Sequence, residues 1–164
     1  MPTVQHLVVD SPYDALTLVA VDGVLSRIHM TDQRHRPPEE TFGAPDPRPF
    51  GEAVRQLDAY FAGELTVFDL PLKLVGTPFQ LRVWEQLRLI PYGETRTYRE
   101  LAEALGSPGA SRAVGLANGK NPVSIVVPCH RVIGASGSLT GYGGGLGRKQ
   151  RLLAFESGRT DTLF

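Results

Sequence analysis

Two helix-start signals in the second half of the chain constrain its fold more than any other feature. Thr77 and Gln80 form a capping box, in which a threonine side chain accepts a hydrogen bond from the backbone three residues on and the glutamine side chain reaches back. Thr97 and Glu100 repeat the pattern, and Gly106 follows as a stop signal. The second half is therefore predicted to be mostly helical.

The two segments after the second capping box are typical of a helix-turn-helix. Residues 97–105 show helical spacing, Ser107-Pro108-Gly109 makes a tight turn, and residues 110–119 form a further short helix of small side chains. Two short helices joined by a glycine-containing turn are the pattern of this DNA-binding motif. Any packed corner of two helices gives the same pattern, so the structural alternative stays open at this point.

The first half has the pattern of a small sheet with one helix. Strand-like runs end at residues 10, 21 and 30, and the Asp22-Gly23 pair between two of them predicts a tight hairpin turn. A proline-rich loop is expected over 31–49, a helix over 50–62 and one more strand over 66–72. We expect an α/β protein, with a small N-terminal α/β subdomain (1–76) that contains an antiparallel sheet. A mostly helical C-terminal domain (77–164) follows.

The formal net charge of zero conceals two oppositely charged halves. The 164 residues carry 17 Lys+Arg and 17 Asp+Glu, with 41 % hydrophobic residues, which excludes a disordered polyelectrolyte. Residues 1–76 have a net charge of −5 and residues 77–164 one of +5, and no acidic residue lies between Glu103 and Glu156. This split fits either two differently solvated surfaces or a basic face for a polyanion.

Composition also limits the cellular locations and the cofactors that we expect for the protein. No signal peptide and no membrane-spanning run is visible, so we expect a cytoplasmic protein without a membrane partner. A single cysteine excludes an internal disulfide and a multi-cysteine zinc site, and the histidines follow no metal-ligand spacing. The glycine-rich run 141–147 does not match a dinucleotide fingerprint. We therefore predict no metal and no cofactor.

A reactive group is indicated where Cys129 and His130 follow the apolar run 123–127, which reads as a buried strand. The thiolate is the nucleophilic form of cysteine, and a histidine can accept the thiol proton directly or through one water. Such a histidine needs an acceptor on its other ring nitrogen, and Glu156 is the only carboxylate after Glu103 apart from one in the tail. An inert buried thiol is the alternative.

Taken together, the residues resemble a known family. The segment from Asn121-Pro122 through Pro-Cys-His-Arg (128–131) to Tyr-Gly-Gly-Gly (142–145) is similar to the active-site region of O6-alkylguanine-DNA alkyltransferases. These proteins are also called methylated-DNA–protein-cysteine methyltransferases. The resemblance extends over residues 77–156, and the first 76 residues fit the family's variable N-terminal subdomain loosely.

The resemblance implies a role for each matching residue. Cys129 corresponds to the alkyl acceptor, His130 to its base, Glu156 to the carboxylate that orients the histidine, and Asn121 to the residue that holds the active-site turn. The DNA contacts implied include Tyr98, which helps to rotate the nucleotide and protonates the guanine, and Arg112, which acts as an arginine finger. Tyr142 forms a wall of the base pocket, and Arg99, by its charge and position, contacts phosphate.

The implied activity is direct repair of O6-alkylguanine, and of O4-alkylthymine, in double-stranded DNA. The alkyl group moves irreversibly to the cysteine after the nucleotide is flipped out through the minor groove, once per protein molecule. Self-association along DNA is left open. Two alternatives are a non-enzymatic sensor of alkylated bases on the same scaffold, and a thiol hydrolase, which leaves the helix-turn-helix and the basic half unexplained.

Overall fold

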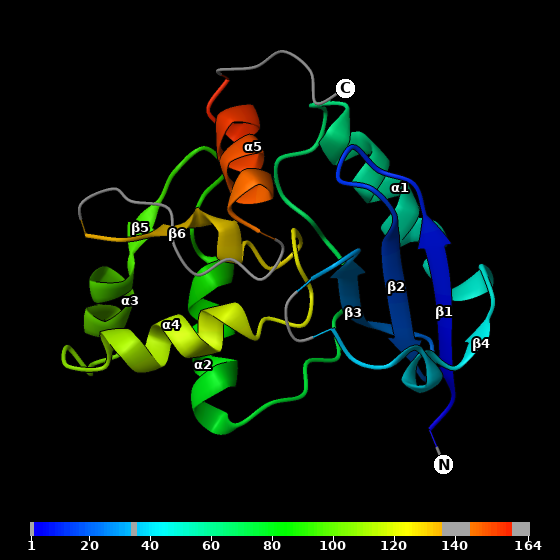
Figure 1. Cartoon of the computed structure of the whole chain (residues 1–164), viewed down its shortest axis with the longest axis horizontal. Coiled ribbons are helices and arrows are strands. Elements are labelled where there is room, and N and C mark those ends of the chain that lie inside the picture. Colours follow the sequence, from blue (N-terminus) through cyan, green and yellow to red (C-terminus); the bar gives the residue numbers. More distant parts are fainter. Residues whose placement is uncertain (1, 34–35, 136–144, 159–164) are drawn as a thin grey trace.

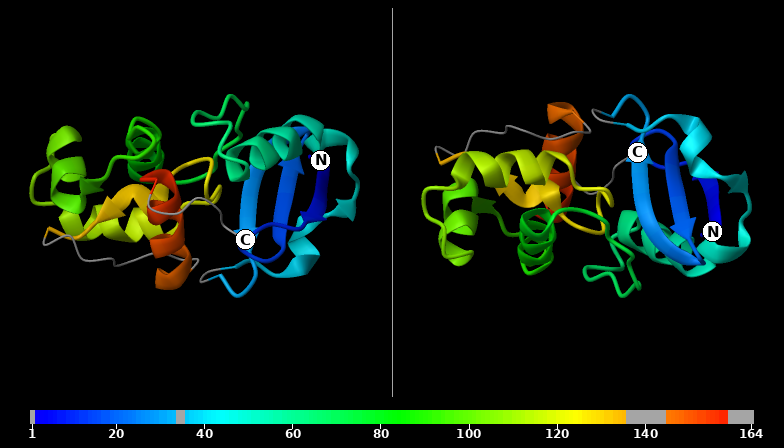
Figure 2. Two further views of the ribbon diagram at one scale, coloured as in Figure 1. Left: turned by 90° about the horizontal axis from the view of Figure 1, so that it is seen from above. Right: turned by 90° about the horizontal axis from the view of Figure 1, so that it is seen from below.

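The computed structural model describes residues 2–33, 36–135 and 145–158, and it confirms the α/β class. A sheet covered by a helix is built from the first half of the chain, and a group of short helices from the second (Figure 1). The two parts lie side by side in both further views, with helix α5 (Leu146–Glu156) at their junction (Figure 2). No helix of the described ranges is long and apolar enough to cross a membrane.

The predicted meander of the first thirty residues is confirmed. The strands of this sheet, in the order β3-β2-β1-β4, are β1 (Val4–Val9), β2 (Leu16–Val21), β3 (Val24–Met30) and β4 (Ala44–Pro45). Neighbours pair antiparallel except β1 with β4. Asp22 and Gly23 have φ of 50° and 81°, the left-handed conformations that a two-residue hairpin turn requires.

Helix α1 (Gly51–Phe61) covers this sheet and closes its core. Its buried side chains recur at helical spacing, and they are Ala53, Gln56, Leu57 and Tyr60. The segment predicted as a loop contains, besides β4, two short 3-10 helices, Glu39–Phe42 and Arg48–Phe50, each of which buries its phenylalanine.

The strand predicted for residues 66–72 is wrong. This segment is irregular, and its backbone forms only an isolated bridge to the sheet, between Leu72 and Leu25 of β3. The Gln56 side chain replaces a neighbouring strand, because its amide donates to the carbonyl of Asp69 at 2.9 Å and accepts from its N–H at 2.9 Å. Pro71 also has no N–H to contribute to a ladder.

Both capping boxes are confirmed, at the starts of α2 (Pro78–Arg88) and α3 (Tyr98–Ala104). After the predicted turn, α4 (Ser111–Gly119) completes the helix-turn-helix. The indole Nε1 of Trp84 in α2 donates to the carbonyl of Ala117 in α4 at 2.8 Å. This buried bond fixes α4 against the helix behind it.

Candidate active site

Cys129 lies in a short 3-10 helix, Cys129–Arg131, and only 4 % of its surface is exposed. Burial raises the pKa of its thiol to about 11, although a hydrogen bond from Asn121 and the charge of Lys149 act in the opposite direction. The thiol is therefore protonated at neutral pH in this state. It needs a base beside it to become a nucleophile.

The run 123–127 is buried as expected, but it is a tight turn rather than a strand. Ile125 has φ of +74°, a left-handed conformation that is costly for a β-branched residue. The Asn121 side chain bridges the turn: its Nδ2 donates to the carbonyl of Val127 at 2.7 Å, and its Oδ1 accepts from the N–H of Val123 at 3.0 Å. Asn121 thus holds the turn that positions the cysteine.

His130, the residue after Cys129, forms a buried pair with Glu156. The Nε2 of His130 lies 2.8 Å from Oε2 of Glu156, and both side chains are at most 1 % exposed. Burial lowers the pKa of His130, although Glu156 opposes the shift, so the imidazole is neutral at pH 7. We assign the proton to Nε2 because that nitrogen faces the carboxylate. The lone pair on Nδ1 is then left to accept a proton.

No protein atom within the described ranges hydrogen bonds to that Nδ1, which is fully buried. A neutral imidazole with its proton held on the far nitrogen is the form that serves as a general base. The arrangement can therefore move a proton from a thiol to Nδ1 while Glu156 stabilises the imidazolium that forms.

Two residues that the sequence analysis missed complete the surroundings of Glu156. Arg131 donates from Nε to Oε1 at 2.7 Å and from Nη2 to Oε2 at 3.0 Å, and the hydroxyl of Tyr60 donates to Oε2 at 2.6 Å. Burial alone would raise the pKa of Glu156, but His130 and Arg131 hold it at about 2. Arg131 adjoins the Cys-His pair in sequence, whereas Tyr60 is 96 residues from Glu156 and gave no local signal.

Lys149 is also buried, so the cations of residues 104–155 cannot all belong to one basic face. Its side chain is 0 % exposed, and its Nζ donates to the carbonyl of Val132. Burial lowers its pKa to about 8, against an opposing effect from Cys129. Lys149 and Arg131 therefore belong to the interior around the thiol.

Three of the predicted DNA contacts, Tyr98, Arg99 and Arg112, lie on the helix-turn-helix. Tyr98 begins α3, and a methyl group added at Gly115 of α4 would stand 3.8 Å from its ring. Arg112 is exposed near the start of α4, and Arg99 is exposed and pairs with Glu103 at 3.1 Å. Tyr142 lies outside the described residues. The structure thus places Cys129, His130, Glu156 and Asn121 in the interior, whereas Arg99 and Arg112 are exposed.

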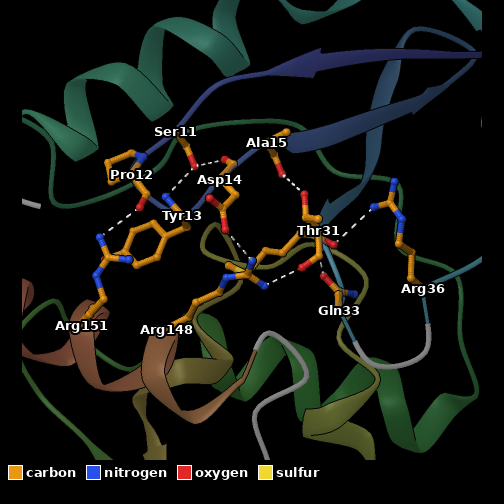
Figure 3. Close-up of polar contacts among 11 residues, drawn as sticks. Ser11, Pro12, Tyr13, Asp14, Ala15, Thr31, Gln33, Arg36, Arg148 and Arg151 are labelled. Atoms are coloured by element: carbon orange, nitrogen blue, oxygen red, sulfur yellow. Dashed lines mark hydrogen bonds and ion pairs between the residues drawn. The ribbon is translucent and has the colours of Figure 1, made fainter. Parts of the chain in front are cut away.

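Helix α5, which carries Glu156 and Lys149, is held against the first half of the chain (Figure 3). Arg148 donates to the carbonyl of Thr31 at 2.7 Å and pairs with Asp14 at 3.1 Å. Arg151 donates to the carbonyl of Pro12 at 3.0 Å. Within the described ranges, no group of three or more His, Cys, Asp and Glu side chains is placed to hold a metal.

The fold and the site define a class: a helix-turn-helix protein with a buried cysteine, histidine and glutamate. Two family models match, "6-O-methylguanine DNA methyltransferase, ribonuclease-like domain" over residues 4–74 and the "DNA binding domain" of the same name over 78–158. The chain belongs to the O6-methylguanine-DNA methyltransferase family.

Curated proteins and solved structures of this family match nearly the whole chain. A methylated-DNA–protein-cysteine methyltransferase of Mycolicibacterium paratuberculosis is 61 % identical over 153 residues, which cover 93 % of this chain and 92 % of the relative. One from Mycobacterium bovis is 57 % identical, with coverage of 95 % and 94 %. A crystal structure of Mycobacterium tuberculosis OGT in complex with DNA is 56 % identical, with a TM-score of 0.90 and coverage of 97 % and 96 %.

Proposed function

We propose that this protein repairs O6-alkylguanine in double-stranded DNA by transferring the alkyl group to Sγ of Cys129, once per molecule. The observation that carries the proposal is the buried His130–Glu156 pair, directly after the buried Cys129 in sequence, with Nδ1 of His130 left without a hydrogen-bond partner among the described residues and available as a base. The relatives supply the reaction class, since they are named methylated-DNA–protein-cysteine methyltransferases.

The chemical step follows from these groups. The thiol proton of Cys129 passes, through one water, to Nδ1 of His130, and the resulting thiolate attacks the saturated carbon on guanine O6. The new S–C bond forms as the C–O6 bond breaks, and that electron pair stays on the guanine, which takes a proton from the hydroxyl of Tyr98. The product thioether is a poor leaving group, so no simple step regenerates the thiol.

Access to the lesion requires nucleotide flipping, because O6 lies inside the duplex. In the proposed complex α4 enters the minor groove, and the small exposed side chain of Ala113 lets the helix approach closely. Arg112 fills the gap in the base stack, Arg99 contacts phosphate and Tyr142 forms a wall of the base pocket. The solved M. tuberculosis relative, described as in complex with DNA, supports DNA as the partner.

The proposal divides the chain at residue 76. Residues 77–164 bind DNA and carry out the transfer, while residues 1–76 support them. A sensor without transfer activity would not need a cysteine next to a base held in this form, so the site favours transfer over sensing.

Mass spectrometry after incubation with DNA that contains O6-methylguanine tests the proposal. We expect a gain of one methyl group on the peptide with Cys129, at one equivalent and no more. Cys129→Ala should abolish the transfer and keep DNA binding, because the thiol lies in the interior and the helix-turn-helix on the surface. A fully reduced wild-type thiol with no mass gain would refute repair, and continued turnover of a small ester would favour a hydrolase.

A further inference from the structure

We propose that Tyr60, in helix α1 of the first half of the chain, is a positioning residue for the transfer: its hydroxyl holds the Glu156 carboxylate that orients His130. The inference rests on the proposed function for its biological meaning. Its physical content concerns how readily Cys129 loses its proton, which can be measured without DNA.

The position of Tyr60 is tightly fixed. Its side chain is 0 % exposed, and the hydroxyl donates to Oε2 of Glu156 at 2.6 Å. The ring packs edge-on against Phe61, Tyr92 and Phe155, at centroid distances of 5.4, 6.2 and 5.7 Å. Phe61 is its neighbour in α1, whereas Phe155 and Tyr92 come from the other half, so rings of both halves aim the hydroxyl at the carboxylate.

Oε2 of Glu156 is the atom that accepts from His130, and it is shared. It also takes the hydroxyl of Tyr60 and one guanidinium nitrogen of Arg131. Each donor stabilises the ionised carboxylate and reduces its affinity for a further proton. The Tyr60 hydroxyl therefore weakens the pull of Glu156 on the proton of His130, and this helps to keep the imidazole neutral.

The other groups that face this pair are also fixed by the structure. Arg131 and Lys149 act on His130 as like charges, and the buried thiol of Cys129 is its neighbour in sequence. The phenols of Tyr13 and Tyr92 are near enough to Glu156 for its charge to raise their pKa values. Tyr60 differs from both phenols because its hydroxyl bonds directly to the carboxylate.

Tyr13 provides a matched control. It is 1 % exposed, and its ring packs against Phe61 with a centroid distance of 5.9 Å. Its buried hydroxyl has no hydrogen-bond partner among the described residues. Tyr60→Phe and Tyr13→Phe each remove one oxygen from a buried ring, but only the first removes a bond to Glu156.

The test is the pH dependence of alkylation of Cys129 by iodoacetamide, followed by intact mass. Cys129 is the only cysteine, so the mass gain reports this thiol alone. In wild type the acidic limb of the rate profile, which reports loss of the His130 proton, should lie below the ordinary histidine pKa. In Tyr60→Phe it should move up by about half a pH unit or more, because Glu156 then holds the imidazolium more strongly.

A second variant gives the opposite sign. A 3-fluorotyrosine at position 60 keeps the shape but is a stronger donor, so the acidic limb should move to lower pH. Tyr13→Phe should leave the limb unchanged. Circular dichroism and thermal unfolding establish that each variant is folded.

Equal profiles for wild type, Tyr60→Phe and the fluorinated protein would overturn the inference. So would a rate that falls by one factor at every pH, since that is the signature of a purely structural role. Failure of the wild-type protein to take a methyl group from DNA would refute the proposed function instead, while the iodoacetamide profiles would still decide the role of Tyr60.

Discussion

The interiors of the two halves of the chain are built differently. Among the described residues of the range 1–76, the buried polar side chains are all uncharged at neutral pH: Thr17, Ser26, His29 and Gln56. In residues 77–164 the buried polar side chains include two cations and a carboxylate: Asn118, Asn121, Ser124, His130, Arg131, Lys149 and Glu156. The first interior follows the usual preference for apolar burial, and the second departs from it around a single cysteine.

The difference shows that the chain buries charged groups, at a cost in stability, only around the reactive cysteine among the described residues. A buried charge is tolerable only when it is paired and hydrogen-bonded, and Glu156 meets that condition through Arg131, His130 and Tyr60. Because Tyr60 comes from residues 1–76 and bonds to Glu156, the two interiors are not independent. Residues 1–76 thus contribute one of the hydrogen bonds that stabilise the buried carboxylate of residues 77–164.

The largest difference in stability between the two interiors should appear when Arg131, one partner of the buried Arg131–Glu156 ion pair, is removed. Arg131→Met leaves the buried Glu156 carboxylate without the guanidinium that pairs with it, so we expect the free energy of unfolding at pH 7 to fall by about 3–5 kcal/mol. Urea unfolding measures the loss.

The control for that variant is a surface ion pair in residues 1–76. Arg55 pairs with Glu52 on the surface of α1, where the Arg55 side chain is 66 % exposed. Arg55→Met should cost far less, because water screens an exposed ion pair. Equal losses in the two variants would mean that burial of the Arg131–Glu156 pair does not set its energetic weight.

Acid should destabilise the charged interior selectively. The pKa of Glu156 is about 2 in the folded protein against an ordinary 4.5, so the unfolded chain binds its proton at higher pH. The stabilisation is therefore complete above about pH 5 and is lost as pH falls towards 2, on the order of 3 kcal/mol in all. His130 acts in the same direction from about pH 6.5 downward, because its pKa is also lowered.

Comparison of wild type with Glu156→Gln isolates this effect in urea unfolding. The variant should be less stable at pH 7, and its deficit should shrink as pH falls to 3. Glu52→Gln, whose carboxylate is on the surface, should give a small difference that high salt removes. A Glu156→Gln deficit that is the same at pH 3 and pH 7 would contradict the linkage.

Short-range patterns predicted the fold well, because the interactions that fix those elements lie within four residues. The two capping boxes and the Asp22-Gly23 turn are of this kind. The strand expected over 66–72 failed because Gln56, from another element, satisfies the backbone there. The strand expected over 123–127 failed because an apolar run indicates burial but not conformation.

The candidate site shows the same limit. The Cys129-His130 pair could be predicted because the two residues are adjacent in sequence. Glu156 could be predicted because few other carboxylates follow Glu103. Tyr60 was not visible, since its role depends on how two halves of the chain pack together. The burial of Lys149 was not predicted either, because the sequence alone does not show which face of α5 is turned inward.

The smallest expected effect concerns the surface rather than the interior. Arg112 is exposed at the start of α4, and in the proposed complex it fills the gap left by the flipped nucleotide. Flipping costs a few kcal/mol, and loss of about 1.4 kcal/mol of compensation slows transfer about tenfold. Arg112→Ala should therefore slow repair of duplex DNA about tenfold and leave reaction with free O6-benzylguanine unchanged. Arg55→Ala, which removes an exposed cation from the acidic half, should change neither rate. Equal slowing of Arg112→Ala on both substrates would place its effect in the transfer step, and the separation between a DNA-reading surface and a reactive interior would fail.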